Sequence, residues 1–467
     1  MDLPKKIHVI GICGVATSAL AIAFEKRGVR VTGSDKGFYP PVSTHLEAAG
    51  IPYYAGWHPE KISEGGTPDL VMVGGGGTSP NNPEAVFARE HNIPVMAYAE
   101  VLNKYFIRKN SVVVAGTWGK TTISSLLSFI MIKGGMDPAY FTGGLSLSHD
   151  TGALTDSDWS VVEGDEYQVS ISDKRPKFAC YAPTHLLLTS VSWDHADLYP
   201  TRDAYFKEFA DLLSKLPTNG LLVSCADDAG VTETLQNSSV KCRAVTYGSS
   251  EKADYHFHSI SHTKKGLDFV IDHAGASTNI HSPMLGRFNA ENIAAAFAMA
   301  SEIGIPADKT AAAIADFKGI KRRLEKRLEA DVTILDCHAP TAEKAASVLE
   351  SIRDVYKQKI IAIYEPNIGG RQRSSAHMYD GSFRDANTVI IPRLTKLKVA
   401  EGSEAPIEGD ELAAIIAKTQ PDVRYIDDDA KLVETVSSLA KKGDVIAFLG
   451  SHGFRGMIEE VTKVLSS

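Results

Sequence analysis

The 467-residue chain has few cysteines and no long apolar segment. Its five cysteines are odd in number and scattered, and none forms a Cys-x-x-Cys pair. This excludes a disulfide scaffold and a zinc knuckle, and it is typical of a reducing compartment. No stretch approaches the roughly 20 apolar residues of a membrane helix. The apolar run 7–24 contains His8 and is broken by two glycines. We therefore expect a cytoplasmic protein that contacts no membrane.

Positive charge is also scarce. Lys and Arg number 49 against 57 Asp and Glu, which gives a net charge of −8 and argues against a nucleic-acid partner. Hydrophobic residues make up 43% and charged residues 23%, which excludes disorder and coiled coil and favours globular domains. The length corresponds to about three domains of roughly 150 residues each.

Short apolar runs alternate with helical segments along the whole chain. Each run ends in glycine, proline or a polar residue, as expected of parallel strands joined by right-handed crossovers. The pattern predicts an α/β protein with domains at 1–107, 108–327 and 328–467. Within the second, the polar, histidine-rich stretch 253–281 predicts antiparallel strands. Ligands of open α/β sheets bind beyond the carboxyl ends of the strands.

A glycine-rich turn opens the second predicted domain, directly after the apolar strand 112–115. Its candidate phosphate contacts are Gly116, Thr117, Gly119, Lys120, Thr121 and Thr122. Backbone N–H groups and a helix N-terminus in such a turn converge on a polyphosphate. Lys120 would reach the β- and γ-phosphates and the Thr121 hydroxyl would take Mg²⁺. The turn is shorter than the full phosphate-loop pattern, and an ordinary strand–helix turn is the alternative.

The first domain carries a second glycine turn. Gly11 and Gly14 follow the first strand and Asp35 ends the second, as in a dinucleotide-binding fingerprint that lacks its third glycine. A dehydrogenase, a structural turn and a nucleotide substrate site are the three interpretations. The glycine run 74–77 ends another strand of this domain. Together with the later phosphate loop, it favours a nucleotide substrate.

Carboxylates and a histidine end two further strands. Glu163 follows one apolar run, and Asp194 with His195 follows another. In a phosphate-loop enzyme, such a carboxylate completes the Mg²⁺ shell and a histidine can hold a second ion. A solvated acidic turn and a helix N-cap are the alternatives.

Taken in order, these motifs resemble the Mur ligase family, the ATP-dependent amide-forming enzymes of peptidoglycan synthesis. The ordered set is GxxGKTT, E-x-D-E, D-H-x-D, Gly286-x-x-Asn289-x-x-Asn292 and Arg322-Arg323-Leu-Glu325. The resemblance covers the whole chain. It implies a Rossmann-like UDP-binding domain, a central ATP-binding phosphate-loop domain and a C-terminal Rossmann-like domain for the amine, with ATP and Mg²⁺ as cofactors.

The resemblance also implies residue roles. The UDP-sugar contacts would be Gly11, Cys13, Gly14, Ser34, Asp35, Gly76 and Thr78. The ATP contacts would be the phosphate-loop residues with Asn289, Asn292, Arg323 and Asp336. The metal ligands would be Thr121, Glu163 and His195, and the catalytic residues Lys120, His195 and Arg323. The acceptor would be held by His338 and by Arg371 and Arg373, whose guanidinium groups suit a peptide's carboxylates.

Two stretches, 33–51 and 163–178, resemble the murein peptide ligase branch. The expected reaction therefore joins L-Ala-γ-D-Glu-meso-diaminopimelate to UDP-N-acetylmuramate through an acyl phosphate. The alternative is the UDP-N-acetylmuramate–L-alanine ligase reaction. A more remote one is a catalytically silent nucleotide sensor, because Trp118, Phe288 and Ala339 depart from the family pattern. We expect a monomer or a weak homodimer.

Overall fold

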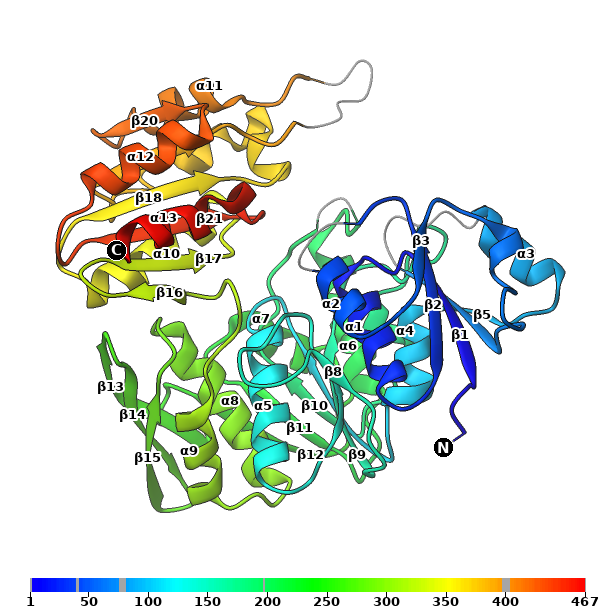
Figure 1. Ribbon diagram of the computed structural model, residues 1–467. Coiled ribbons are helices and arrows are strands. Elements are labelled where there is room, and N and C mark those ends of the chain that lie inside the picture. The colour runs from blue at the N-terminus through cyan, green and yellow to red at the C-terminus, as the bar shows by residue number, and fades with distance from the viewer. Residues whose placement is uncertain (1, 39–41, 75–80, 196–197, 397–403, 467) are drawn as a thin grey trace. The chain divides into compact units, whose positions relative to one another are not determined.

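The computed structural model describes residues 2–38, 42–74, 81–195, 198–396 and 404–466 (Figure 1). Contacts along the chain divide it into two compact units. The first comprises Met1–Ser259, Phe269–His281 and Ala290–Phe317, and the second comprises Ile260–Asp268, Ser282–Asn289 and Lys318–Ser467. No helix among the described residues is long and apolar enough to cross a membrane.

The first sheet is parallel throughout and has the order β3-β2-β1-β4-β5. Its strands are β1 (Lys6–Ile10), β2 (Arg30–Asp35), β3 (Tyr53–Ala55), β4 (Leu70–Val73) and β5 (Val95–Ala97). The helices of this region are α1 (Val15–Glu25), α2 (Val42–Ala48), α3 (Pro83–Glu90) and α4 (Tyr98–Val101). The central strand β1 is buried along its whole length, as expected of a parallel strand covered on both faces.

The second sheet has ten strands in the order β15-β14-β13-β12-β11-β10-β6-β9-β7-β8. They are β6 (Asn110–Ala115), β7 (Ala139–Phe141), β8 (Gly152–Ala153), β9 (Trp159–Gly164), β10 (His185–Leu188), β11 (Leu221–Cys225), β12 (Arg243–Gly248), β13 (Tyr255–Thr263), β14 (Gly266–His273) and β15 (Ala276–Ser282). The helices are α5 (Lys120–Lys133), α6 (Arg202–Ser214), α7 (Ala229–Gln236), α8 (Phe288–Glu302) and α9 (Ala307–Asp316). Because β6 pairs in parallel with both β9 and β10, their carboxyl ends meet at one edge.

The third sheet has the order β16-β17-β21-β18-β19-β20. Its strands are β16 (Glu325–Glu329), β17 (Thr333–Cys337), β18 (Ile360–Glu365), β19 (Thr388–Pro392), β20 (Val423–Ile426) and β21 (Val445–Gly450). The helices are α10 (Ala342–Val355), α11 (Gly409–Ile416), α12 (Asp429–Leu439) and α13 (Met457–Leu465). β16 is antiparallel to β17, whereas the other neighbours pair in parallel.

Short helical turns complete the chain. They are η1 (Pro59–Lys61), η2 (Leu102–Phe106), η3 (Lys177–Cys180), η4 (Gly369–Arg371), η5 (Arg373–Tyr379) and η6 (Phe454–Gly456).

The predicted α/β class is confirmed, with three sheets and helices between their strands. The histidine-rich stretch forms β13, β14 and β15, which neighbour one another and are joined by two-residue connections. Such short connections make antiparallel hairpins. The domain boundaries remain proposals. Since β16 begins at Glu325 and pairs within the third sheet, we place the start of the third domain before residue 328.

Candidate active site at the phosphate loop

The turn between β6 and α5 requires glycine at two positions. Gly116 has a φ of +138°, and a Cβ there would lie 2.0 Å from Thr189 Oγ1. Gly119 has a φ of +81° and precedes the first residue of α5, and a Cβ there would lie 2.4 Å from Asn292 Oδ1. Only glycine combines these dihedral angles with such close neighbours. The loop is therefore packed against the end of β10 and against α8.

Hydrogen bonds to residues that follow β10 fix the two residues between these glycines. The Thr117 hydroxyl donates to the carbonyl oxygen of Ser192 at 3.0 Å and accepts from its N–H at 2.9 Å. The Thr189 hydroxyl donates to the Trp118 carbonyl at 2.6 Å. The indole of Trp118 itself is 46% exposed. Thr117 is thus a structural support of the loop, while the Trp118 side chain stands at the surface.

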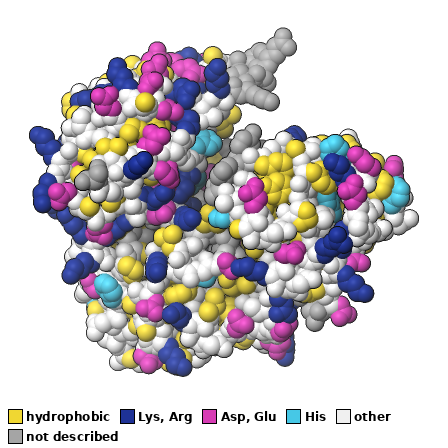
Figure 2. Space-filling view, viewed as in Figure 1, with side chains coloured by type: hydrophobic (Ala, Val, Ile, Leu, Met, Phe, Trp, Pro, Cys, Tyr) yellow, Lys and Arg dark blue, Asp and Glu magenta, His cyan; other side chains and the backbone are white. Residues whose placement is uncertain are grey.

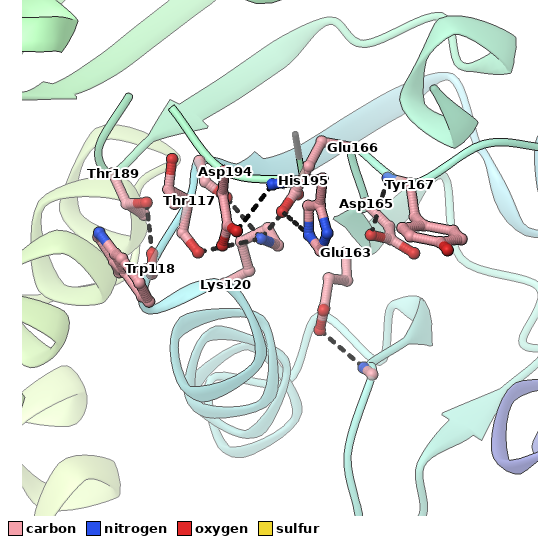
Figure 3. Close-up of polar contacts among 12 residues, drawn as sticks. Thr117, Trp118, Lys120, Glu163, Asp165, Glu166, Tyr167, Thr189, Asp194 and His195 are labelled. Atoms are coloured by element: carbon pink, nitrogen blue, oxygen red, sulfur yellow. Dashed lines mark hydrogen bonds and ion pairs between the residues drawn. The ribbon is translucent and has the colours of Figure 1, made fainter. Parts of the chain in front are cut away.

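Lys120 is held by a buried carboxylate from the loop after β9 (Figure 3). Its Nζ lies 2.8 Å from Glu166 Oε2 and donates to the Gly116 carbonyl at 2.5 Å. Burial lowers the pKa of Lys120, but the negative charges of Glu166 and Glu163 outweigh this and leave the pKa raised. Lys120 is therefore a permanent cation next to the loop's backbone, where a polyphosphate needs one.

His195 approaches the same carboxylate from the other side. Its Nε2 lies 3.6 Å from Glu166 Oε1, and its backbone adopts a left-handed φ of +54°. The interaction with the nearby Glu166 carboxylate is the main cause of a raised His195 pKa. Glu166, only 3% exposed, thereby connects Lys120 with His195.

Glu163 and Thr121 form an oxygen pair beside this cluster. Glu163 Oε1 accepts from the Thr121 hydroxyl at 3.1 Å, and Oε2 accepts from the Gly143 N–H at 2.8 Å. Burial raises the pKa of Glu163, and the charge of Lys120 opposes the shift. A carboxylate and a hydroxyl side by side are the hard oxygen donors that Mg²⁺ prefers. The donor set therefore fits Mg²⁺, and the roles of Thr121 and Glu163 as its ligands stay predictions.

Glu166 and Lys177 are site residues that the sequence reasoning did not single out. Lys177 Nζ lies 2.5 Å from Asp165 Oδ2 and above the Tyr167 ring, and the Tyr167 ring packs edge-on against His195. The signal available in the sequence was the last glutamate of E-x-D-E and the basic stretch that follows it. Their contacts depend on how the loop after β9 folds back, which the spacing does not reveal.

The predicted ATP contacts outside the loop are differently placed. Asn292 lies against Gly119, whereas the Asn289 amide donates to the Leu285 carbonyl at 2.7 Å. Asp336 on β17 is 2% exposed and pairs with Arg322 at 3.3 Å and Arg327 at 3.4 Å. These arginines oppose the effect of burial, which raises the Asp336 pKa. The roles of Asn289, Asp336 and Arg323 stay predictions.

The predicted UDP-sugar residues gather at the ends of β1 and β2. The Gly11 N–H donates to the Ser34 carbonyl at 2.8 Å, and the Cys13 N–H donates to Asp35 Oδ2 at 2.8 Å. The Ser34 hydroxyl is fully buried and donates to Glu84, so its side chain makes a hydrogen bond inside the domain. Gly76 and Thr78 lie outside the described residues.

The predicted acceptor residues belong to the second unit. Burial lowers the pKa of His338 to about 4, and the charges of Arg323 and Arg322 add to the effect. Arg371 is 2% exposed, donates to the Ile407 and Thr395 carbonyls and pairs with Glu408 at 2.9 Å.

Arg373 is better placed for an external ligand. Its side chain is 44% exposed and pairs with Glu411 and with Glu404. An exposed guanidinium can exchange such carboxylate partners for those of a ligand, whereas the contacts of Arg371 tie it to its own domain. The acceptor roles of both arginines remain predictions.

Comparison with known proteins supports the family. Three family models match in succession: "Mur ligase family, catalytic domain" at residues 6–109, "Mur ligase middle domain" at 114–300, and "Mur ligase, glutamate ligase domain" at 322–452. A UDP-N-acetylmuramate–L-alanine ligase of Paenarthrobacter aurescens is 32% identical over 458 residues, covering 96% of this chain and 94% of that protein.

Two solved structures extend the comparison. The UDP-N-acetylmuramate–alanine ligase of Thermotoga maritima has a TM-score of 0.80 at 20% identity and covers 99% of both chains. The UDP-N-acetylmuramate:L-alanyl-γ-D-glutamyl-meso-diaminopimelate ligase of Neisseria meningitides is 26% identical, with a TM-score of 0.61, and covers 68% of this chain and 100% of that one. The chain therefore belongs to the Mur ligase family, whose members are ATP-dependent amide-forming ligases.

Proposed function

We propose that the protein joins the lactoyl carboxylate of UDP-N-acetylmuramate to the amino group of L-alanine at the expense of ATP. The observation that carries the ligase chemistry is the cluster of Lys120, Glu166, Glu163 and Thr121 at the phosphate loop. The choice of L-alanine rests on relatives with that activity in their names, which are 30–32% identical over nearly the whole chain. This acceptor replaces the tripeptide as our leading hypothesis.

The reaction needs activation because a carboxylate and an amine do not condense at neutral pH. The carboxylate attacks the γ-phosphorus of ATP, ADP leaves, and an acyl phosphate forms. The amine then attacks the acyl carbon and forms the C–N bond, the acyl C–O bond breaks so that phosphate leaves with its electron pair, and the nitrogen loses a proton. Phosphoryl transfer depends mainly on positioning and charge neutralisation. Lys120 supplies a fixed cation at the loop, and Mg²⁺ bound by Thr121 and Glu163 would add charge neutralisation at the phosphates.

A murein tripeptide is the second candidate acceptor. It is favoured by the 26% identity to the ligase of Neisseria meningitides and by the stretch 163–178. Part of that stretch lies in the site, since Lys177 pairs with Asp165 beside Tyr167. A peptide presents several carboxylates, and Arg373 is an exposed guanidinium that can pair with one of them.

The decisive experiment compares acceptors in a phosphate-release assay with ATP, Mg²⁺ and UDP-N-acetylmuramate. We expect kcat/KM for L-alanine to exceed that for L-Ala-γ-D-Glu-meso-diaminopimelate by at least about tenfold, roughly 1.4 kcal/mol of transition-state binding. A preference for the tripeptide would reverse our assignment. If no phosphate were released with either acceptor, the result would instead favour the nucleotide sensor.

Arg373→Ala provides an internal check of the acceptor. If the tripeptide is the substrate, the variant raises its KM about tenfold, as expected for one lost charged contact. If L-alanine is the substrate, its KM stays within about twofold of the parent value, because a single carboxylate needs no second arginine. The matched control is Arg384→Ala, which removes another exposed arginine that pairs with Asp385.

A further inference from the structure

The hairpin of β13 and β14 carries a group of polar side chains that the ligase reaction does not use. His256 and His258 alternate along β13 with the buried residues Tyr255 and Phe257. Because side chains two positions apart on a strand share one face, both histidines lie on the face opposite these aromatic rings. Asp272 lies on the neighbouring strand β14. In Figure 2, histidine side chains reach the surface over this part of the sheet.

The three side chains are close enough to share one ion. One ligand atom from each of His256, His258 and Asp272 lies within 4.8 Å of the other two. His258 Nε2 is already 3.0 Å from Asp272 Oδ2, and the two imidazole rings are 4.9 Å apart. Ligands of a tetrahedral Zn²⁺ at about 2.0–2.1 Å stand roughly 3.4 Å from one another. Half-exposed side chains reach that separation by small rotations about their side-chain bonds.

Two serine hydroxyl groups form hydrogen bonds with the His258 and Asp272 side chains. The Ser259 Oγ lies 2.9 Å from His258 Nδ1, and the Ser277 hydroxyl donates to Asp272 Oδ1 at 2.6 Å. Ser259 adopts a left-handed φ of +57° inside β13, a conformation that non-glycine residues rarely adopt. Metal-binding histidines and carboxylates commonly have such hydrogen-bond partners, which fix the orientation of the ligand. Together these contacts prearrange both side chains.

We propose that His256, His258 and Asp272 form a binding site for a divalent transition-metal ion, with Zn²⁺ as the favoured ion. Two imidazole nitrogens and one carboxylate oxygen suit Zn²⁺, Co²⁺ or Ni²⁺, whereas Mg²⁺ prefers oxygen ligands alone. Water would occupy the fourth position. The site is separate from the phosphate loop, because β10, β11 and β12 stand between β13 and β6 in the sheet. The bound ion would crosslink β13 to β14.

The test is a Zn²⁺ titration of the chelator-treated full-length protein in competition with a chromophoric chelator. We expect one ion per chain at this site and an affinity that falls at least tenfold in both His258→Ala and Asp272→Asn. Co²⁺ serves as a second probe. Its visible d–d bands should show imidazole and carboxylate ligation, and its near-ultraviolet spectrum should lack the intense sulfur charge-transfer band that a cysteine ligand produces. The matched control is His91→Ala, which removes a histidine from the end of α3.

Several outcomes would overturn the site. They are no Zn²⁺ binding by the parent protein, unchanged affinity in both variants, or a cysteine signature with Co²⁺. In each case His258 and Asp272 would be a cross-strand ion pair only. Zn²⁺-induced shifts of the His256 and His258 NMR signals in the parent protein test the site without any substitution. Mg²⁺-dependent phosphate release should be equal in all variants, so this inference and the proposed ligase reaction can fail separately.

Discussion

At the scale of single residues, the buried carboxylate of Glu166 contacts two side chains to which we assign catalytic roles. One oxygen pairs with Lys120 at 2.8 Å and the other lies 3.6 Å from His195. Glutamine has the same shape without the charge, so Glu166→Gln leaves Lys120 as a less compensated buried cation. Glu166 thereby acts as a positioning residue.

We expect Glu166→Gln to lower kcat at least about tenfold while the KM for ATP changes less than about threefold, because the effect acts through the placement of Lys120. Steady-state phosphate release measures both constants. Asp173→Asn is the control, since Asp173 belongs to the same loop but pairs with the exposed Arg175. An unchanged kcat, or a loss seen only in KM, would contradict the positioning role.

The residue scale also shows where sequence reasoning is strong and where it ends. Thr121 and Glu163 could be placed together because the carboxyl ends of neighbouring parallel strands meet. The burial of Arg371 could not be predicted, since its guanidinium donates to carbonyls of Thr395 and Ile407, far along the chain. Likewise, the hydrogen bond from the Ser34 hydroxyl to Glu84 could not be predicted, because Glu84 lies 50 residues further along the chain.

At the scale of elements, the start of α5 packs closely against α8. Gly119 has a φ of +81°, and its missing side chain makes room for Asn292. Gly135, just after the same helix, has a nearly identical φ of +82°, but a Cβ added there would meet nothing within 4 Å. Substituting each glycine by alanine therefore distinguishes the cost of the left-handed backbone, which both share, from the cost of the steric contact, which only Gly119 has.

We expect Gly119→Ala to lower the free energy of unfolding by about 1–3 kcal/mol more than Gly135→Ala, which carries only the backbone cost of about 1–2 kcal/mol. Urea unfolding followed by circular dichroism gives both values. The ATP KM should rise in Gly119→Ala alone, because the loop must shift away from Asn292. Equal destabilisation by the two substitutions would show that Asn292 on α8 can move away from an added Cβ without an energetic cost.

Elements are easier to predict from this sequence than their partners. Apolar runs ending in polar residues suffice for the strands, and two-residue connections make β13–β15 antiparallel. β16 escapes prediction because its five residues, Glu325–Glu329, are mostly charged and resemble a surface loop. It is an edge strand, and among the described residues it pairs with β17 alone, so it needs little apolar sequence of its own.

At the scale of the whole molecule, the predicted binding sites for the UDP sugar and for ATP lie at the strand ends of two different sheets. Gly11, Gly14 and Asp35 lie at the ends of β1 and β2 in the first sheet. Lys120 follows β6 in the second sheet, and its contacts with Gly116 and Glu166 come from that sheet's loops. Removing the Lys120 side chain should therefore affect only one of the two ligands.

We expect Lys120→Ala to reduce phosphate release at least about a hundredfold, the effect of removing one preorganised charge from a phosphoryl-transfer site. Its Kd for UDP-N-acetylmuramate, measured by calorimetry without ATP, should stay within about twofold of the parent value. Asp35→Asn is the reciprocal variant. It should weaken UDP-sugar binding at least about tenfold, since Asp35 holds the Cys13 N–H of the glycine turn, and leave ATP binding unchanged. If Lys120→Ala weakened the sugar nucleotide as much as Asp35→Asn does, the two ligands would share one site and the assignment of the first sheet would be wrong.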